Sequence, residues 1–409
     1  MKILYIHQHF VVRSGTSGGR SHEFSRVLVD RGHEVTIVTG AYDRSGLEGR
    51  GAGLVERMRI DGIEVVSIRV PYSQNMGMLR RMLAFLQFVV LSSWVAARSG
   101  RPDLVFATST PLTVCIPGIL ASMRWRRPFV FEVRDLWPAV PIEMGVLRNP
   151  LARWAAKRLE RIAYRRAEKV VALSPGMKEG IVAAGVLPGK VAVIPNASDV
   201  ELFRENEPAG IRFRAAHPEL GARPVVAYVG AFGRVNGLEY MLSLAREVAA
   251  IDPSVAFLLV GQGSEEARLK AMSEEMGLSG RSVFILPAVP RQELASVLGA
   301  ATVLSSVFLP LPAMEANSAN KFFDAFAAGK PVIVNYRGWH ADLLRETGAG
   351  LALPPDDIPA AARRLVEALG DETWLERAAS ASRRLGDVEF NRRNLALALE
   401  AVFEDVHAC

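Results

Sequence analysis

The sequence predicts an α/β protein of two domains, each built around a parallel sheet, and three observations support this. The chain has 409 residues, enough for two or three domains of ordinary size. Short apolar runs alternate with amphipathic helical stretches along the chain, a pattern typical of βαβ units. The alternation is interrupted at residues 202–223, where prolines and glycines predict a linker.

The first series of elements spans residues 1–203, and we expect it to form an N-terminal domain. Apolar runs predict strands at residues 2–10, 33–40, 63–69, 104–107, 129–133, 170–173 and 191–194. A glycine-rich turn follows the first strand, and the helix after that turn ends at Gly32.

The second series spans residues 204–390 and predicts a C-terminal domain with the same alternation. Strands are expected at residues 225–230, 255–261, 282–288, 303–308 and 331–335, with helices between them at 237–250, 265–276 and 321–329. A last helix, at about residues 391–409, has no strand after it. We therefore expect that helix to pack back on the first domain.

Composition and charge exclude several classes of protein. Half of the residues are hydrophobic, which argues against a disordered chain. The net charge of +6 is compatible with an anionic partner or with an excess of charge that aids solubility. The two cysteines, Cys115 and Cys409, have no partners at metal-ligand spacing, so we expect no metal site and a reducing, cytoplasmic environment. The N-terminus resembles a first strand and not a signal peptide. The sequence has no P-loop and no nucleic-acid-binding module.

Two glycine-rich turns occupy equivalent places in the two series. Gly18 and Gly19 precede the first helix, where backbone without side chains can approach a ligand and the helix N-terminus favours anions. The turn at residues 230–237 contains Arg234, whose planar guanidinium suits phosphate oxygens. Each turn alone is compatible with an ordinary strand-to-helix connection.

A third motif lies at residues 317–335, where a helix is expected to start near Asn320. Lys321 in its first turn and Asp324 one turn later share a helix face. The amides at such a helix start can bind phosphate with help from Lys321, and a carboxylate such as Asp324 can accept both ribose hydroxyls. A surface Lys–Asp pair would show the same spacing.

These motifs, taken in order, resemble family 4 retaining glycosyltransferases of the GT-B fold. The resemblance covers nearly the whole chain: GHEVTIVTG (32–40), FEVRDLWP (131–138), AEKVVALSPGMKEGI (167–181), VAVIPNASDVELF (191–203), YVGAFGRVNG (228–237), LLVGQG (258–263) and NKFFDAFAAGKPVI (320–333). It implies two Rossmann-like domains whose parallel sheets face each other across an interdomain cleft, and a reaction without a metal cofactor.

The resemblance also implies roles for individual residues in binding a nucleotide-diphosphate sugar. Asp324 would hold the ribose, and Arg234 and Lys321 would bind the diphosphate. Gly18 and Gly19 would approach the donor from the other domain. The backbone near residues 287–289 would meet the base.

Three positions depart from the family pattern. The family has two glutamates separated by seven residues; Asp324 takes the place of the second and Ala316 that of the first, with Glu315 one position away. The contact to the donor sugar is therefore expected from the turn at residues 317–320. Asn236 stands where the family has a lysine of the diphosphate pair, so Lys321 is expected to compensate.

The third departure concerns the acceptor side, where Arg134 replaces the histidine of many members. Strand alternation places Glu132 and Arg134 on one face, with Asp135 at the strand end. We expect these three residues to act on the acceptor: a carboxylate would orient its hydroxyl, and Arg134 would pair with that carboxylate or with an acceptor phosphate.

Two predicted helices indicate a membrane-facing side of the first domain. The stretch at residues 79–98 is apolar nearly all round, and residues 151–169 carry a ladder of basic residues beside an apolar stripe. The segment MRWRRP (123–128) adds three arginines around a tryptophan. We expect peripheral association with the inner face of the cell membrane, although solvated basic faces remain an alternative.

The resemblance is greatest to a branch that builds bacterial surface polysaccharides and is similar to N-acetyl-L-fucosamine transferases of O-antigen assembly. It implies transfer of an N-acetylated deoxyhexosamine or hexosamine, expected to be UDP-linked, to a polyprenyl-diphosphate-linked saccharide. A UDP-sugar 2-epimerase on a similar fold and a non-catalytic membrane-surface scaffold remain alternatives. A dinucleotide oxidoreductase is disfavoured because neither glycine turn has the full fingerprint.

Overall fold

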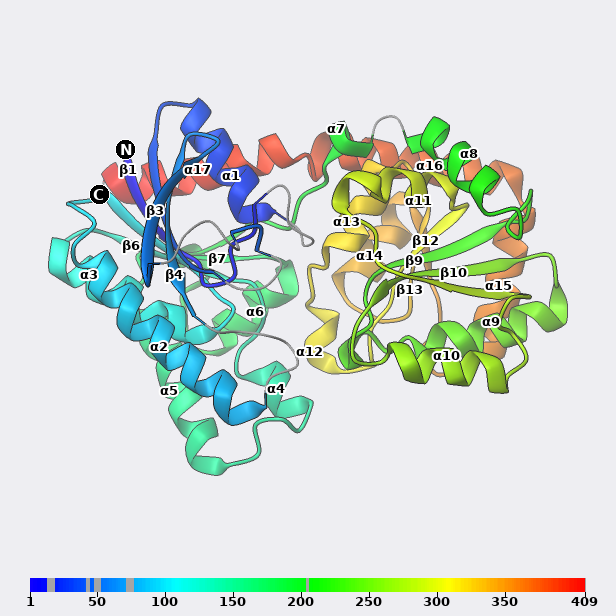
Figure 1. Cartoon of the computed structure of the whole chain (residues 1–409), viewed down its shortest axis with the longest axis horizontal. Helices are drawn as coiled ribbons and strands as arrows, with labels where there is room; N and C mark the ends of the chain where they lie inside the picture. The colour runs from blue at the N-terminus through cyan, green and yellow to red at the C-terminus, as the bar shows by residue number, and fades with distance from the viewer. Residues whose placement is uncertain (13–18, 42–44, 48–52, 71–76, 204–205, 409) are drawn as a thin grey trace. The chain divides into compact units, whose positions relative to one another are not determined.

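The structure is a computed structural model that divides into two compact units. The first unit consists of Met1–Pro195 and Arg392–Cys409, and the second of Asn196–Asn391. Each unit has a largely parallel sheet covered by helices, so the α/β prediction is confirmed (Figure 1). The residues that the structure describes are 1–12, 19–41, 45–47, 53–70, 77–203 and 206–408.

The sheet of the first unit has the strand order β3-β4-β2-β1-β5-β6-β7-β8. Its strands are β1 (Lys2–Ile6), β2 (Glu34–Ala41), β3 (Val55–Ile60), β4 (Ile63–Arg69), β5 (Leu104–Thr108), β6 (Phe129–Val133), β7 (Lys169–Ala172) and β8 (Val191–Val193). In the central strand β1, residues 3–6 are buried on both faces, which explains why no charged residue follows Lys2 in it.

Strand β3 was not predicted from the sequence, and it pairs antiparallel with β4. Its sequence VERMRI carries three charged residues, and each of its side chains is at least partly accessible to solvent. An edge strand of this kind lacks the apolar signal by which buried strands are recognised.

The helices of the first unit lie on both sides of this sheet (Figure 1). They are α1 (Arg20–Asp30), α2 (Met78–Ala96), η1 (Leu112–Val114), α3 (Cys115–Trp125), α4 (Ala139–Glu143), α5 (Pro150–Arg166), α6 (Pro175–Ala183), η2 (Pro188–Lys190) and the last helix, α17 (Arg392–Ala408). Helix α17 packs against α1. There Glu400, only 4% exposed, pairs with Arg31 and, at 2.7 Å, with His33.

The sheet of the second unit has the strand order β11-β10-β9-β12-β13-β14, and neighbouring strands in it run parallel. Its strands are β9 (Val225–Ala231), β10 (Ala256–Gln262), β11 (Val283–Leu286), β12 (Val303–Ser306), β13 (Val332–Val334) and β14 (Gly350–Ala352). Its helices are α7 (Val200–Phe203), α8 (Asn206–Ala216), η3 (Arg234–Asn236), α9 (Glu239–Ile251), α10 (Glu266–Glu275), η4 (Arg291–Glu293), α11 (Leu294–Ala300), α12 (Pro312–Glu315), α13 (Asn320–Ala327), α14 (Trp339–Thr347), α15 (Ile358–Gly370), α16 (Glu372–Arg384) and η5 (Leu385–Glu389).

The expected linker at residues 202–223 is wrong, because this segment contains helix α8 packed on α11. This packing explains why Gly210, which was interpreted as part of a linker, is a glycine. A Cβ on Gly210 would lie 2.2 Å from the backbone carbonyl carbon of Gly299. Gly210 therefore permits close contact between two helices. The chain passes from the first unit to the second earlier, after Pro195.

Candidate functional site

The N-terminus of helix α13 is open to an anion. Its N-cap is Ala319, which has no side chain to accept a bond from the first free amides, and Asn320 at the first helical position is half-buried. Phe322, Phe323 and Phe326 are fully buried and anchor the helix in the unit. The helix is thus held rigidly, and the amides of its first turn carry the partial positive charge that binds phosphate groups.

Lys321 extends from this turn to the glycine-rich turn after β9. Its Nζ donates to Oδ1 of Asn236 at 2.7 Å and to the hydroxyl of Tyr228 at 3.2 Å. The same ammonium lies 4.2 Å from the ring centre of Phe308 and 4.7 Å from that of Tyr228. Burial lowers the pKa of Lys321 to about 7. An anion beside this amine would favour its charged form.

The glycine-rich turn is pinned in place from within. Asn236 also donates from Nδ2 to the carbonyl of Ala231 at 2.9 Å, and Tyr228 donates its hydroxyl to the same carbonyl at 2.9 Å. Gly237 has a φ of 56° and closes η3, where a Cβ would lie 3.0 Å from a backbone nitrogen. Arg234 remains exposed at the start of η3. Lys321 and Asn236 are therefore brought together in the second unit.

Asp324 is paired, which the sequence did not indicate. Its side chain is 13% exposed, and its Oδ1 lies 3.5 Å from Nη2 of Arg291. The same nitrogen lies 3.9 Å from Oδ2 of Asp199. Arg291 thus holds two carboxylates that come from distant parts of the sequence, and only the folded chain reveals that contact. The segment at residues 287–289, expected near the base, follows β11 and is largely exposed.

In the turn at residues 317–320, the side chain of Asn317 forms hydrogen bonds with the backbone. Oδ1 of Asn317 accepts from the amide of Ala319 at 3.1 Å, and its Nδ2 donates to the carbonyl of Met314 at 2.5 Å. The amide of Asn317 is therefore not free for a sugar. Ala316 is buried and Glu315 is exposed. The carbonyls of Asn317 and Ser318 accept from Trp339 and Asn196, so we expect a ligand to meet this segment at the side chain of Asn320.

In the first unit, Gly18 lies outside the described residues. Gly19 is the N-cap of α1 and, like Ala319, provides no side-chain cap. The next residue, Arg20, begins the helix and is 4% exposed. Sequence inspection did not single out Arg20, yet it organises the centre of this unit.

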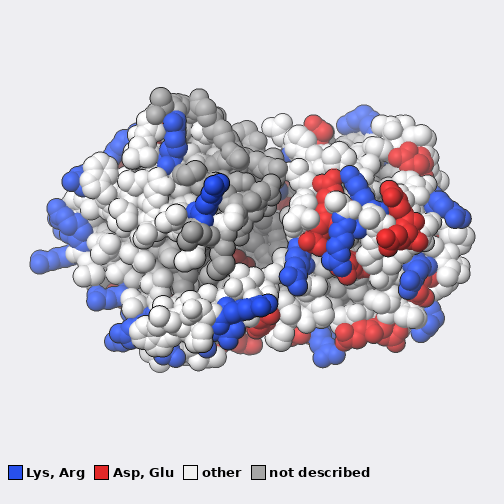
Figure 2. Space-filling model, turned by 60° about the horizontal axis from the view of Figure 1, so that its bottom comes forward, with Lys and Arg blue, Asp and Glu red and all other residues white. Residues whose placement is uncertain are grey.

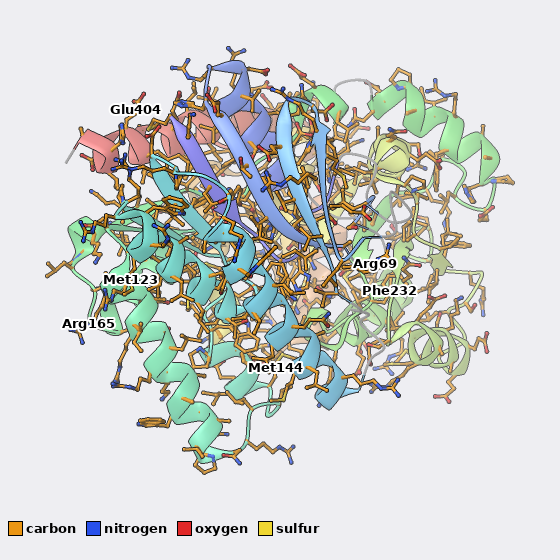
Figure 3. All side chains as sticks on the ribbon, turned by 60° about the vertical axis from the view of Figure 1, so that its left-hand side comes forward. Arg69, Met123, Met144, Arg165, Phe232 and Glu404 are labelled. Carbon is orange, nitrogen blue, oxygen red and sulfur yellow. The ribbon has the colours of Figure 1, made fainter. Side chains whose placement is uncertain are left out.

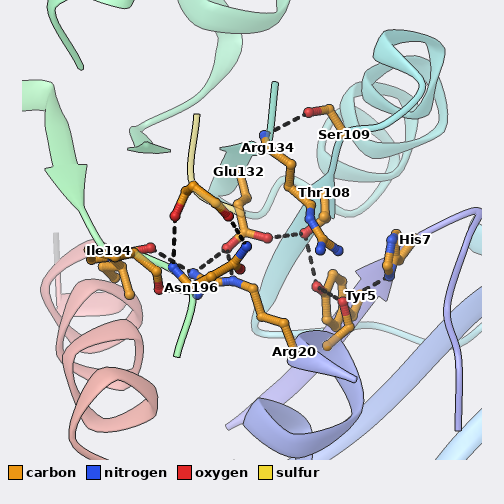
Figure 4. Close-up of polar contacts among 12 residues, drawn as sticks. Tyr5, His7, Arg20, Thr108, Ser109, Glu132, Arg134, Ile194 and Asn196 are labelled. Carbon is orange, nitrogen blue, oxygen red and sulfur yellow. Dashed lines mark hydrogen bonds and ion pairs between the residues drawn. The ribbon is translucent and has the colours of Figure 1, made fainter. Parts of the chain in front are cut away.

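Glu132 is buried beneath the expected acceptor edge. Its Oε1 accepts from Nη2 of Arg20 at 2.8 Å and from Nε at 3.1 Å, and its Oε2 accepts from the hydroxyl of Thr108 at 2.9 Å (Figure 4). The residue is 1% exposed. Arg134 was expected to pair with a carboxylate of this edge or with an acceptor phosphate; the carboxylate of Glu132 contacts Arg20 and Thr108 instead. We assign Glu132 a structural role instead of contact with an acceptor.

The Arg20–Glu132 pair also fixes the end of the first unit. Arg20 donates from Nη2 to the carbonyl of Ile194 at 2.9 Å and from Nη1 to that of Pro195. A hydrogen-bonded chain continues from Thr108 through the Tyr5 hydroxyl at 2.9 Å. Every polar group of this buried network has a partner, which such a network needs to be stable.

Arg134 and Asp135 lie just beyond the end of β6. The backbone amide of Arg134 donates to Oγ of Ser109 at 3.0 Å, and Oδ2 of Asp135 accepts from the hydroxyl of Thr110 at 2.8 Å. Arg134 is half-buried and Asp135 exposed. Burial, with the nearby Arg134 guanidinium, lowers the pKa of His7, and the same causes lower that of His9 to about 4. These histidines were not identified in the sequence.

Comparison with known proteins covers both units. Residues 15–197 match the glycosyl transferase 4-like domain, and residues 211–385 match glycosyl transferases group 1. A putative colanic acid biosynthesis glycosyl transferase of Escherichia coli K12 is 25% identical over 298 residues, which are 70% of this chain and 72% of that protein.

Solved structures share the fold along the full length. A sucrose-phosphate synthase from Thermosynechococcus elongatus has a TM-score of 0.78 and 20% identity, covering 100% of this chain and 99% of that one. The Anabaena protein HepE, solved with UDP-glucose, has a TM-score of 0.73 and 20% identity, covering 99% and 100%. The two matched domains, with this fold, show that the chain belongs to the family 4 glycosyltransferases of the GT-B fold.

Proposed function

We propose that this glycosyltransferase moves a sugar from a UDP-linked donor to a polyprenyl-diphosphate-linked saccharide, with retention of anomeric configuration. The donor site is supported by the hydrogen bond from Lys321 to Asn236 at the uncapped start of α13. A buried amine and uncapped backbone amides thus lie together at this point, and both bind the oxygens of a diphosphate well. The HepE complex, with UDP-glucose bound to the same fold, supports a UDP donor.

In this proposal the leaving diphosphate is stabilised by charges that the protein already holds in place. The bond from the anomeric carbon to the diphosphate oxygen breaks as the acceptor hydroxyl bonds to that carbon from the same side, and the proton of the hydroxyl passes to the departing diphosphate oxygen. Lys321, Arg234 and the α13 amides stabilise the negative charge that grows on the diphosphate. Because these groups supply the positive charge, we propose that the reaction needs no metal ion.

Asp324 supplies the nucleotide contact in the same proposal. Arg291 lies 3.5 Å from its carboxylate and orients it. A carboxylate can accept from both ribose hydroxyls. The donor sugar is proposed to be an N-acetylated hexosamine or deoxyhexosamine, as in the O-antigen fucosamine transferases that the motifs resemble. It would meet the first turn of α13 near Asn320.

The enzyme is proposed to work in surface-polysaccharide assembly, as a peripheral protein of the inner membrane face. The colanic acid relative supports that pathway class. Across the described residues, no helix is long and apolar enough to cross a membrane. Peripheral binding is supported by the exposed apolar and basic side chains on one face of the first unit.

That face is formed by α2, α3 and α5, which lie side by side; Met123 and Arg165 mark the ends of α3 and α5 in Figure 3. We call it the α2–α3–α5 face. Large apolar side chains stand exposed on it: Met82, Leu83, Leu86, Val90 and Trp94 on α2, Leu120 and Met123 on α3, and Leu151, Trp154 and Ile162 on α5.

The charge on this face suits anionic lipid headgroups. Arg124 of α3 and five basic residues of α5, namely Lys157, Arg158, Arg161, Arg165 and Arg166, are exposed. The three helices contain one acidic residue, Glu160, which accepts a hydrogen bond from Tyr164. On the face shown in Figure 2, the first unit (left) carries mostly basic side chains, whereas acidic and basic side chains are mixed on the second. Apolar and basic groups together are typical of a surface that binds anionic membranes.

The transferase proposal is tested by incubating the enzyme with a panel of UDP-, GDP- and ADP-sugars and membrane lipid extracts. We expect UDP-sugar-dependent labelling of lipid, lost in both Arg234→Ala and Asp324→Ala. Donor turnover without acceptor, with epimerised sugar as product, would instead indicate the epimerase. Nucleotide-sugar binding that is absent altogether would indicate a scaffold.

A further inference from the structure

Arg134 is a cation whose neighbouring carboxylates bind other residues. Glu132, two positions earlier, pairs with Arg20. Asp135, the next residue, accepts from Thr110. Among the ion pairs formed by described residues, none includes Arg134. Within the part of the first unit that the structure describes, no carboxylate pairs with this guanidinium.

The residues around Arg134 are hydrogen-bonded to one another and largely buried. Its backbone is held by Ser109 at 3.0 Å, and its side chain runs beside Thr108 toward Tyr5 and His7 in Figure 4. His7 is 3% exposed, and its Nδ1 lies 2.8 Å from the hydroxyl of Ser21. The guanidinium lies near enough to disfavour protonation of His7 and His9. Neutral imidazole rings carry no charge that could neutralise the guanidinium.

We propose that Arg134, with His7 and His9 beside it, binds a phosphate group of the acceptor. A guanidinium offers two parallel N–H donors that match phosphate oxygens, and partial burial strengthens the contact relative to water. The proposal rests on the proposed function, because a polyprenyl-diphosphate acceptor supplies such a group. It adds a second phosphate site, located in the first unit and separate from the one at Lys321.

The test is calorimetric titration of inorganic pyrophosphate into enzyme saturated with UDP, which occupies the donor site. We expect one pyrophosphate to bind, with affinity reduced about ten- to hundredfold in Arg134→Gln, the usual effect of losing a charged hydrogen-bond partner. Arg134→Lys should retain part of that affinity. Arg59→Gln, which removes an exposed arginine of the edge strand β3, should bind as the wild type does. Thermal unfolding of each variant confirms that it is folded.

Two results would overturn the proposal: UDP-saturated wild type that binds no pyrophosphate, or equal binding by wild type and Arg134→Gln. Failure of the proposed function is recognised separately, since UDP itself would then not bind. In that case pyrophosphate is titrated into the Lys321→Met variant, in which the site at Lys321 has lost its charge. If pyrophosphate still binds to Lys321→Met and no longer binds when Arg134→Gln is added, the site at Arg134 is supported. If Arg134→Gln leaves pyrophosphate binding unchanged, the site is rejected.

Discussion

The Nζ of Lys321 donates to Oδ1 of Asn236 at 2.7 Å, so that the start of α13 and the glycine-rich turn after β9 share one buried amine. Asn236 occupies the place of a family lysine, and a second ammonium at this distance would repel the first. The contact explains how a cation from α13 can take the place of the family lysine beside Arg234. It also makes binding at this site depend on the protonation of Lys321.

Affinity for UDP should fall as pH rises above neutrality. Burial sets the pKa of Lys321 to about 7 in the free protein, and the charged form binds diphosphate, so above pH 7 binding must take up a proton. We expect affinity to decrease by up to about tenfold per pH unit above pH 7, until the pKa of the bound state is reached. Calorimetry between pH 6 and about 9 measures this.

Two controls accompany that titration. Lys321→Arg stays charged throughout and should show little dependence on pH over this range. Uridine, which lacks the diphosphate, should bind wild type with pH-independent affinity. A wild-type affinity for UDP that stays flat from pH 6 to 9 would refute the role of Lys321.

Arg291 should act as a positioning residue for Asp324. Arg291→Gln removes the charge that holds this carboxylate at 3.5 Å and leaves Asp199 and Asp324 without their shared partner. We expect UDP affinity to fall about tenfold, with partial recovery in Arg291→Lys. Arg246→Gln, on the exposed surface of the same unit, serves as the control. Unchanged affinity in Arg291→Gln would show that Asp324 is oriented by other contacts.

The Arg20–Glu132 pair should contribute to stability more than to binding. Glu132→Gln leaves Arg20 buried without a counter-charge, which typically costs about 3–5 kcal/mol. The matched control is Glu64→Gln, which breaks the exposed pair with Arg57 and should cost about 1 kcal/mol or less. Urea unfolding followed by tryptophan fluorescence gives both values. Similar losses in the two variants would contradict the importance of the buried pair.

Membrane binding should require both the apolar and the basic parts of the α2–α3–α5 face. We expect the protein to sediment with phosphatidylglycerol-containing vesicles and much less with phosphatidylcholine vesicles. Arg158→Gln with Arg161→Gln and Arg165→Gln should weaken binding, at about 1 kcal/mol per removed charge. Leu86→Ser with Val90→Ser should weaken it at any salt concentration. Equal sedimentation with both vesicle types would exclude an electrostatic contribution.

The sequence predicted the fold well where elements are buried and poorly where they are exposed. Strand β1 and helix α13 were recognisable from apolar periodicity, whereas the charged edge strand β3 was not. Gly210 was interpreted as a sign of a linker because a close helix contact and a flexible turn require the same residue.

For the candidate site, the sequence indicated residues but not their partners. Lys321 and Asp324 share a helix face by spacing, yet one contacts Asn236 and the other Arg291. Alternation along β6 likewise gave Glu132 its face, but not its pairing with Arg20. Such pairings join distant parts of the chain, and local pattern carries no information about them.

The central claim is that the second unit binds the UDP part of the donor, with Asp324 on the ribose. It is tested most directly by calorimetry of UDP and 2′-deoxy-UDP with wild type and Asp324→Ala. Our account predicts that wild type prefers UDP by about ten- to hundredfold, the value of a hydrogen bond to a charged group, and that Asp324→Ala binds the two equally. An undiminished preference for UDP in Asp324→Ala would contradict it.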